Sequence, residues 1–227
     1  MARAVVEPPS VVRGVQSISS ADTRHQRCGE VHASIAFMSD FPPQLPSLAG
    51  RLVRLREWRP SDVAVVQEAS RDPLIPLITT VPVTDGKPEA LAFVERQSAR
   101  LRTGAGYAFA IANANDVAVG HVGLFFASGQ RTRASAGYWV ARSSRRRGYA
   151  ADALQTITRR ARTHDDLDRL ELYIEPWNEG SLRAAELAGY QREGLMRAWQ
   201  RVGGEPRDML MYAQLNQHVA RNAGATV

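Results

Sequence analysis

The segment Ser143–Ala150, which reads Ser-Ser-Arg-Arg-Arg-Gly-Tyr-Ala, constrains the fold more than any other part of the chain. Residues 136–140 before it are aromatic and β-branched, which is typical of a β-strand. Apolar residues after it recur at helical spacing, at Ala150, Ala153, Leu154, Ile157 and Ala161. The sequence therefore predicts a strand, a basic turn that contains a glycine, and a helix, in that order.

A turn of this kind can bind an anion. The first backbone N–H groups of a helix lack partners within the helix and lie at the positive end of its dipole. Gly148 has no Cβ and allows close approach to the backbone, while Arg145, Arg146 and Arg147 add positive charge. We therefore expect a phosphate group at this turn. The alternative is an exposed arginine-rich turn that only begins a helix.

Two other phosphate-binding patterns do not fit the turn. The ATP-binding loop needs a second glycine and a lysine followed by Ser or Thr, and the dinucleotide-binding pattern needs three glycines. The turn contains one glycine and no lysine. These two patterns are therefore excluded at this place.

The length of the chain, 227 residues, suits one domain with tails. Residues 1–47 are rich in proline, serine and arginine and show no periodicity, so we expect a flexible extension or a start that is set too early, with Met38 as the later start. We expect one domain over residues 48–216 and a tail over 217–227. No apolar run approaches a membrane span, and one cysteine, Cys28, excludes an internal disulfide. We expect a cytoplasmic protein with no membrane partner.

The charge of the chain could indicate nucleic-acid binding. The net charge is +6, but Lys87 is the only lysine among 29 basic residues, and the arginines are scattered except at the turn. Such a bias is typical of a GC-rich coding sequence. A basic surface interleaved with aromatic residues, as in RNA-binding domains, is absent from the sequence. We therefore expect no nucleic-acid partner, and an RNA-binding domain stays a rival interpretation.

The periodicity of the whole chain predicts a mixed sheet with helices on both faces. Strands are expected at residues 51–56, 107–111, 117–126, 134–140, 169–175, 190–195 and 207–215. Helices are expected from Ser61 as N-cap, over 88–104, from the basic turn to about Thr163, and over 178–188. Residues 72–86 and 128–131 are expected to be a loop and a turn, and Gly203–Gly204 joins the last two strands.

Two motifs in this order resemble a known family. Arg145-x-x-Gly148-x-Ala150 is similar to the Q/R-x-x-G-x-G/A signature of the GCN5-related N-acetyltransferases (GNAT). Asn178-x-x-Ser181, followed by Gly189–Tyr190, resembles the ribosomal-protein N-terminal acetyltransferases of the RimJ/RimL type. The resemblance covers residues 51–215. It implies an α/β (α+β) fold, in which a mostly antiparallel sheet is splayed between the strands before and after the pyrophosphate-binding helix.

The resemblance also implies a reaction and its residues. Acetyl-CoA would be the co-substrate, with no metal and no covalent enzyme intermediate. It implies that cofactor contacts come from Arg145, Arg146, Arg147, Gly148, Tyr149, Ala150, Asn178 and the backbone of Trp139 and Val140. Ser181 would protonate the departing thiolate; many relatives use a tyrosine where this chain has Ala185. The alternatives are core packing for the Trp139 side chain and helix capping for Asn178 and Ser181.

The base and the acceptor are less constrained. Glu175, at the end of a strand, is the nearest acid to the expected cleft, and His121 is the other titratable candidate. The alternatives are that Glu175 is only a solvated strand end, that His121 is a buried histidine with its hydrogen bonds satisfied, and that the amine loses its proton to water. The resemblance implies a protein N-terminal α-amine as acceptor, with an aminoglycoside or polyamine as the second choice. A non-catalytic acyl-CoA sensor and a homodimer are further possibilities.

Overall fold

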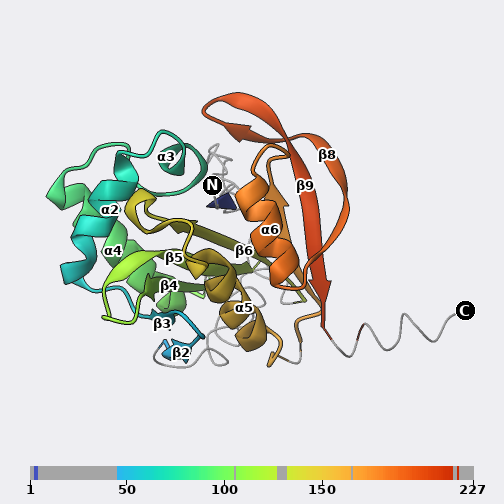
Figure 1. The fold of residues 1–227 in the computed structure, drawn as a ribbon, viewed down its shortest axis with the longest axis horizontal. Coiled ribbons are helices and arrows are strands. Elements are labelled where there is room, and N and C mark those ends of the chain that lie inside the picture. The colour runs from blue at the N-terminus through green and yellow to red at the C-terminus, as the bar shows by residue number, and fades with distance from the viewer. Residues whose placement is uncertain are drawn as a thin grey trace, which may run out of the picture.

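The structure is a computed structural model, and it describes residues 3–4, 45–104, 106–126, 132–164, 166–216 and 219. A nine-stranded sheet runs through the molecule in the order β2-β3-β4-β5-β6-β7-β9-β8, with β1 paired to β6 (Figure 1). The strands are β1 (Arg3–Ala4), β2 (Leu48–Ala49), β3 (Arg54–Arg56), β4 (Gly106–Ala112), β5 (Ala118–Phe126), β6 (Arg133–Val140), β7 (Arg169–Ile174), β8 (Gln191–Val202) and β9 (Glu205–Leu215).

Helices cover both faces of this sheet. They are α2 (Val63–Ser70), α3 (Ile75–Ile78), α4 (Lys87–Arg102), α5 (Tyr149–Ala161) and α6 (Glu179–Leu187), with 3-10 turns η1 (Pro60–Asp62) and η2 (Arg142–Ser144). One apolar core lies between the sheet and α5 and α6, and a second lies between the sheet and α2 and α4. Strand β6 contributes to both cores because successive side chains point to opposite faces: Tyr138 and Val140 join the first, Trp139 the second.

The expected splay lies between β6 and β7. These strands are parallel and pair only at their beginnings, from Arg133–Ser135 to Arg169–Glu171. All other pairs in the sheet are antiparallel. Beyond Ser135 the two strands diverge, and β1 lies there against β6, β7 and α6. The mixed, mostly antiparallel sheet with this splay is the predicted fold class, and the structure confirms it.

Three predicted elements differ from the structure. Ser61 is not an N-cap: η1 precedes the helix, and the carboxylate of Asp62 accepts the backbone N–H of Arg59 at 2.9 Å. The predicted loop over 72–86 contains α3, because Asp72 Oδ1 accepts the N–H groups of Leu74 and Ile75. Strand β8 runs to Val202, since Gly203 and Gly204 both adopt positive φ and turn the chain tightly into β9.

Some sequence-based predictions lie outside the described residues. They are the turn at 128–131, most of the extension over 1–47, and nearly all of the tail over 217–227. Among the residues that are described, no helix combines the length and the apolar character needed to cross a membrane.

Candidate active site

The turn between β6 and α5 has two residues in the left-handed region. Gly148 has φ +79° and is the N-cap of α5, and Arg146 has φ +64°. Glycine suits position 148 because a residue with a Cβ is strained at this φ. An added Cβ would also lie 3.1 Å from Cδ1 of Leu52. The described residues supply no side-chain cap to α5. Its first N–H groups therefore face outward at the positive end of the helix dipole.

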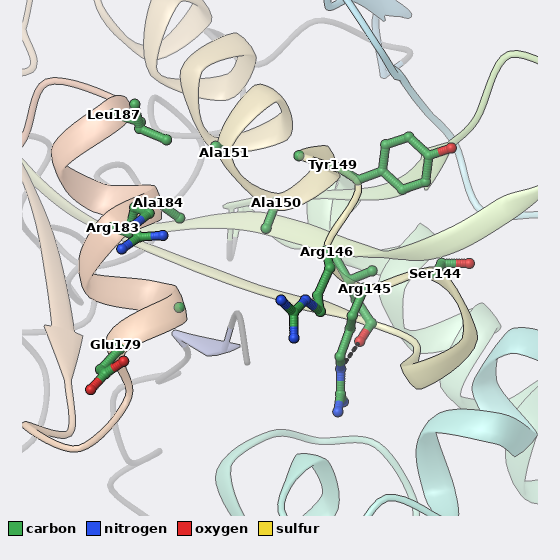
Figure 2. Close-up of a pocket in the computed structure, with 13 residues that line it drawn as sticks. Ser144, Arg145, Arg146, Tyr149, Ala150, Ala151, Glu179, Arg183, Ala184 and Leu187 are labelled. Carbon is green, nitrogen blue, oxygen red and sulfur yellow. Dashed lines mark hydrogen bonds between the residues drawn. The ribbon is translucent and has the colours of Figure 1, made fainter.

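A pocket of about 510 Å³ opens at this turn. One wall is the turn with the first residues of α5, and the other wall is one side of α6 (Figure 2). Six of the predicted cofactor residues line it, namely Val140, Arg145, Arg146, Gly148, Tyr149 and Ala150. The other predicted site residues are not part of the lining; they are Trp139, Arg147, Asn178, Ser181 and Glu175.

The guanidinium of Arg145 has protein partners. Its Nε donates to the Val140 carbonyl at 2.9 Å, and an Nη donates to Asp72 Oδ2 at 2.6 Å. Both side chains are buried, with 9% of Arg145 and 2% of Asp72 exposed. Burial raises the pKa of Asp72, but the backbone N–H of Leu74 and the Arg145 guanidinium outweigh it and hold that pKa below its ordinary value. Arg145 therefore braces the turn against the segment after α2.

A second contact joins α2 to the same turn. The carboxylate of Glu68 accepts the backbone N–H of Ser143 at 2.8 Å and its hydroxyl at 2.9 Å. Together with the Asp72–Arg145 pair, this contact attaches the turn both to α2 and to the segment that follows it. The turn is thereby held in one conformation before any ligand binds, which lowers the entropy cost of binding.

Arg183 is a site residue that sequence reasoning missed. It lies on α6, lines the pocket and is exposed. Figure 2 shows the guanidinium groups of Arg146 and Arg183 reaching in from opposite walls. The available signal was helical spacing: Arg183 lies one turn after Glu179 on the helix that Asn178 caps, and residues four apart share a face. The two arginines make the pocket suitable for an anion that fits between the walls.

Asn178 and Ser181 lie at the beginning of α6. Asn178 is the N-cap, and its Oδ1 accepts the Ser181 backbone N–H at 3.3 Å. Ser181 is completely buried, and its Oγ has no hydrogen-bond partner in the described part of the chain. The capping alternative for Asn178 is thus realised. The Ser181 hydroxyl does not cap, and it keeps a proton that no described group accepts.

The two candidate bases have different surroundings. Glu175 is half-buried just after β7, and its carbonyl accepts the Asn178 N–H at 3.0 Å. His121 is buried in the second core, where its Nδ1 accepts the Trp58 indole N–H at 3.3 Å. Burial, with a smaller contribution from the charge of Arg100, lowers the pKa of His121 to about 3. A ring this weakly basic, with its lone pair already engaged, is a poor proton acceptor, which argues against His121 as the base.

The low pKa of His121 predicts a stability that falls in mild acid. In the unfolded chain the ring has its ordinary pKa of about 6.5, so below that pH the unfolded state binds a proton that the folded state does not. The stabilising contribution is complete above pH 6.5 and is lost at about 1.4 kcal/mol per pH unit as the pH falls toward 3. Urea unfolding at pH 7 and pH 5 should show about 2 kcal/mol more loss in the wild type than in His121→Asn. Equal losses would contradict the assignment of a neutral buried ring.

The part of the chain that contains the pocket is also the part that is similar to known proteins. Residues 52–191 match the family described as "Acetyltransferase (GNAT) domain". The chain is 28% identical over 110 residues to the uncharacterized N-acetyltransferase p20 of Bacillus licheniformis, a match that covers 48% of this chain and 62% of the relative. The match thus spans less than two thirds of that relative's length.

Solved structures share the fold. RimJ of Mycobacterium smegmatis in complex with CoA-disulfide has a TM-score of 0.63 at 24% identity, over 81% of this chain and 96% of RimJ. RimL, described as a ribosomal L7/L12 alpha-N-protein acetyltransferase in complex with coenzyme A, has a TM-score of 0.61 at 17% identity, over 75% of this chain and 98% of RimL. Both likenesses concern the path of the backbone.

Proposed function

Since this chain belongs to the acetyltransferase (GNAT) family, we propose that it transfers an acetyl group from acetyl-CoA to a primary amine. The observation that carries the proposal is the pocket between the β6–α5 turn and α6. It combines uncapped helix N–H groups with two arginines from opposite walls. This is the chemistry that a pyrophosphate requires.

The residues of the pocket fit acetyl-CoA as follows. The N–H groups at the beginning of α5 and the guanidinium groups of Arg146 and Arg183 hold the phosphates. The pantetheine arm extends along the edge of β6 beside Trp139 and Val140, where that strand has left β7, and it takes the place of β1 there. Asn178 holds the beginning of α6 on the opposite side. Arg145 contributes by bracing the turn, and Arg147 adds charge at long range.

The transfer needs two proton movements. The amine nitrogen attacks the thioester carbon when it is neutral, so its proton passes to Glu175, directly or through water. The new N–C bond forms as the C–S bond breaks. The leaving thiolate takes the proton of the Ser181 hydroxyl, which no described group accepts in the free protein. Backbone N–H groups near Trp139 and Val140 stabilise the carbonyl oxygen as it becomes negative.

A protein N-terminal α-amine is the acceptor that we propose. Support comes from the likeness to RimL, because RimL is described as an alpha-N-protein acetyltransferase. A small-molecule amine is the second candidate, because a spermidine N-acetyltransferase that is a chimera of the Vibrio cholerae enzyme and hSSAT has the same fold, with a TM-score of 0.60. The fold alone does not separate the two acceptor classes.

A thermal melt with excess acetyl-CoA tests the cofactor site. At a hundredfold excess over Kd we expect about 2.7 kcal/mol of stabilisation, which is a rise of about 5–10 °C in Tm for a domain of this size. Arg146→Glu should remove most of the rise. Arg142→Glu is the matched control, since Arg142 is exposed beside the turn but does not line the pocket. An unchanged Tm at millimolar acetyl-CoA would contradict the proposal.

A second measurement separates an enzyme from a sensor. Release of the CoA thiol is followed with a panel of peptide and small-molecule amines. A rate that depends on the amine supports transfer. Binding of acetyl-CoA without thiol release for any amine would instead indicate a non-catalytic acyl-CoA sensor.

A further inference from the structure

A small second pocket lies on the opposite face of the sheet from the cofactor pocket. It has a volume of about 10 Å³, which is room for about one water-sized group. His121 and Gly137 line it together with Trp139, whose indole belongs to the core beside α2 and α4. The backbone of Trp139 is the place predicted to meet the thioester. The side chain of Trp139 therefore borders the pocket, while the backbone of the same residue borders the proposed reaction point.

A pair of glycines lies at the pocket. Gly123 of β5 and Gly137 of β6 are directly opposite each other in the sheet. A Cβ at Gly123 would lie 2.5 Å from Cζ of Phe125 and 3.1 Å from Nε2 of His121. The side chains of Phe125 and His121 therefore fill the space beside Gly123, and Gly137 is the member of the pair that lines the pocket.

Two side chains that line the pocket carry hydrogen-bond donors. Nδ1 of His121 accepts from Trp58, so the neutral ring carries its proton on Nε2, on the side of Gly123. Nε1 of Trp139 is a donor only, and it is buried without a partner among the described residues. A buried donor left unpaired costs free energy, so it is available for an acceptor atom that enters the pocket.

The charges around the pocket also favour an oxygen over an amine. Arg100 lies over the ring of Phe125 at 4.9 Å, and Arg96 lies over the ring of Phe93 at 5.8 Å. Both rings line the pocket, and none of its described lining residues carries a carboxylate. A second ammonium group would meet donors and positive charge here, whereas a carbonyl oxygen would meet groups that complement it.

We propose that this pocket is an acceptor subsite that binds the carbonyl oxygen next to the reacting amine. This proposal rests on the proposed function, and it narrows the class of amine that the protein accepts. An N-terminal α-amine has such a carbonyl two bonds away, and a polyamine has none. The subsite therefore selects peptides and amino-acid amides over polyamines.

Two amines of matched shape test the subsite. L-Alaninamide carries the carbonyl, and isopropylamine has the same branching without it. The quantity measured is the ratio of their kcat/KM values in each variant, because the ratio between variants cancels the intrinsic reactivity of the amines. Trp139→Phe removes the indole donor. His121→Asn keeps an acceptor for Trp58 but withdraws the Nε2 donor, because the asparagine side chain is too short to place its amide N–H groups there. Each should lower the preference for alaninamide about tenfold, the usual effect of losing one buried hydrogen bond.

Phe93→Leu is the matched control. It shortens a wall of the same pocket without removing a donor, so it should change both kcat/KM values by the same factor. An equal preference for alaninamide in Trp139→Phe, His121→Asn and the wild type would contradict the subsite. It would not contradict the proposed acetyltransferase activity. Absence of thiol release with either amine would count against the proposed function itself.

A spectroscopic signal gives an independent readout. The indole N–H resonance of Trp139, identified by its loss in Trp139→Phe, is followed in ¹⁵N-labelled protein saturated with CoA. N-acetyl-alaninamide, the product of the proposed reaction, should shift it, and N-isopropylacetamide should not. A resonance that responds to neither compound, or equally to both, would contradict binding of this carbonyl.

Discussion

Replacing Asp72 with alanine should lower the free energy of unfolding by about 3 kcal/mol, because it leaves the buried guanidinium of Arg145 without its ion-pair partner. For a domain of this size that is a fall of about 10 °C in Tm. The same substitution removes the oxygen that accepts the N–H groups at the beginning of α3. Urea unfolding measures the loss directly.

The chain contains a matched control for this experiment. Asp85 pairs with Arg71 at the same distance, 2.6 Å, but the two side chains are 49% and 67% exposed. Asp85→Ala should therefore lower the free energy of unfolding far less than Asp72→Ala does. The double variant Asp72→Leu with Arg145→Met should be more stable than Asp72→Ala alone, because it leaves no unpaired buried charge. Equal losses in Asp72→Ala and Asp85→Ala would show that the buried pair does not brace the turn.

Replacing Ser181 with alanine should lower the activity rather than the stability. We expect kcat to fall about a hundredfold, since that is the usual contribution of a positioned proton donor. Stability should stay the same or rise slightly, because the hydroxyl is buried without a partner in the described part of the chain. Steady-state thiol release gives kcat, and thermal melts with and without acetyl-CoA show whether folding and cofactor binding are intact.

Two further variants make this result specific to the proton. Ser181→Cys keeps a proton donor of similar size and should retain more activity than Ser181→Ala. Ser70→Ala removes another buried serine hydroxyl, one that donates to the Val66 carbonyl at 3.0 Å on α2, and should leave kcat unchanged. A Ser181→Ala variant with kcat within twofold of the wild type would exclude this hydroxyl as the acid.

Much of the fold and about half of the lining of the candidate pocket could be predicted from the sequence. The strand, turn and helix around Gly148 follow from residues within about twenty positions, because hydrophobic periodicity and a left-handed backbone are local requirements. The same holds for Asn178 as a cap, since the N–H that it accepts is three residues away. The Gly203–Gly204 turn is equally local, although the length of β8 is set by its pairing with β9.

The tertiary structure decided how the side chains of the site are used. Arg145 looks like a phosphate ligand in sequence, and only folding brings Asp72, 73 positions away, to its guanidinium. His121 looks like a base until Trp58, 63 positions away, engages its lone pair and burial lowers its pKa. Arg183 becomes a pocket residue because α6 packs against α5. Backbone conformation is set by neighbours in the chain, whereas the charge, burial and partners of a side chain depend on segments that meet only after the chain has folded.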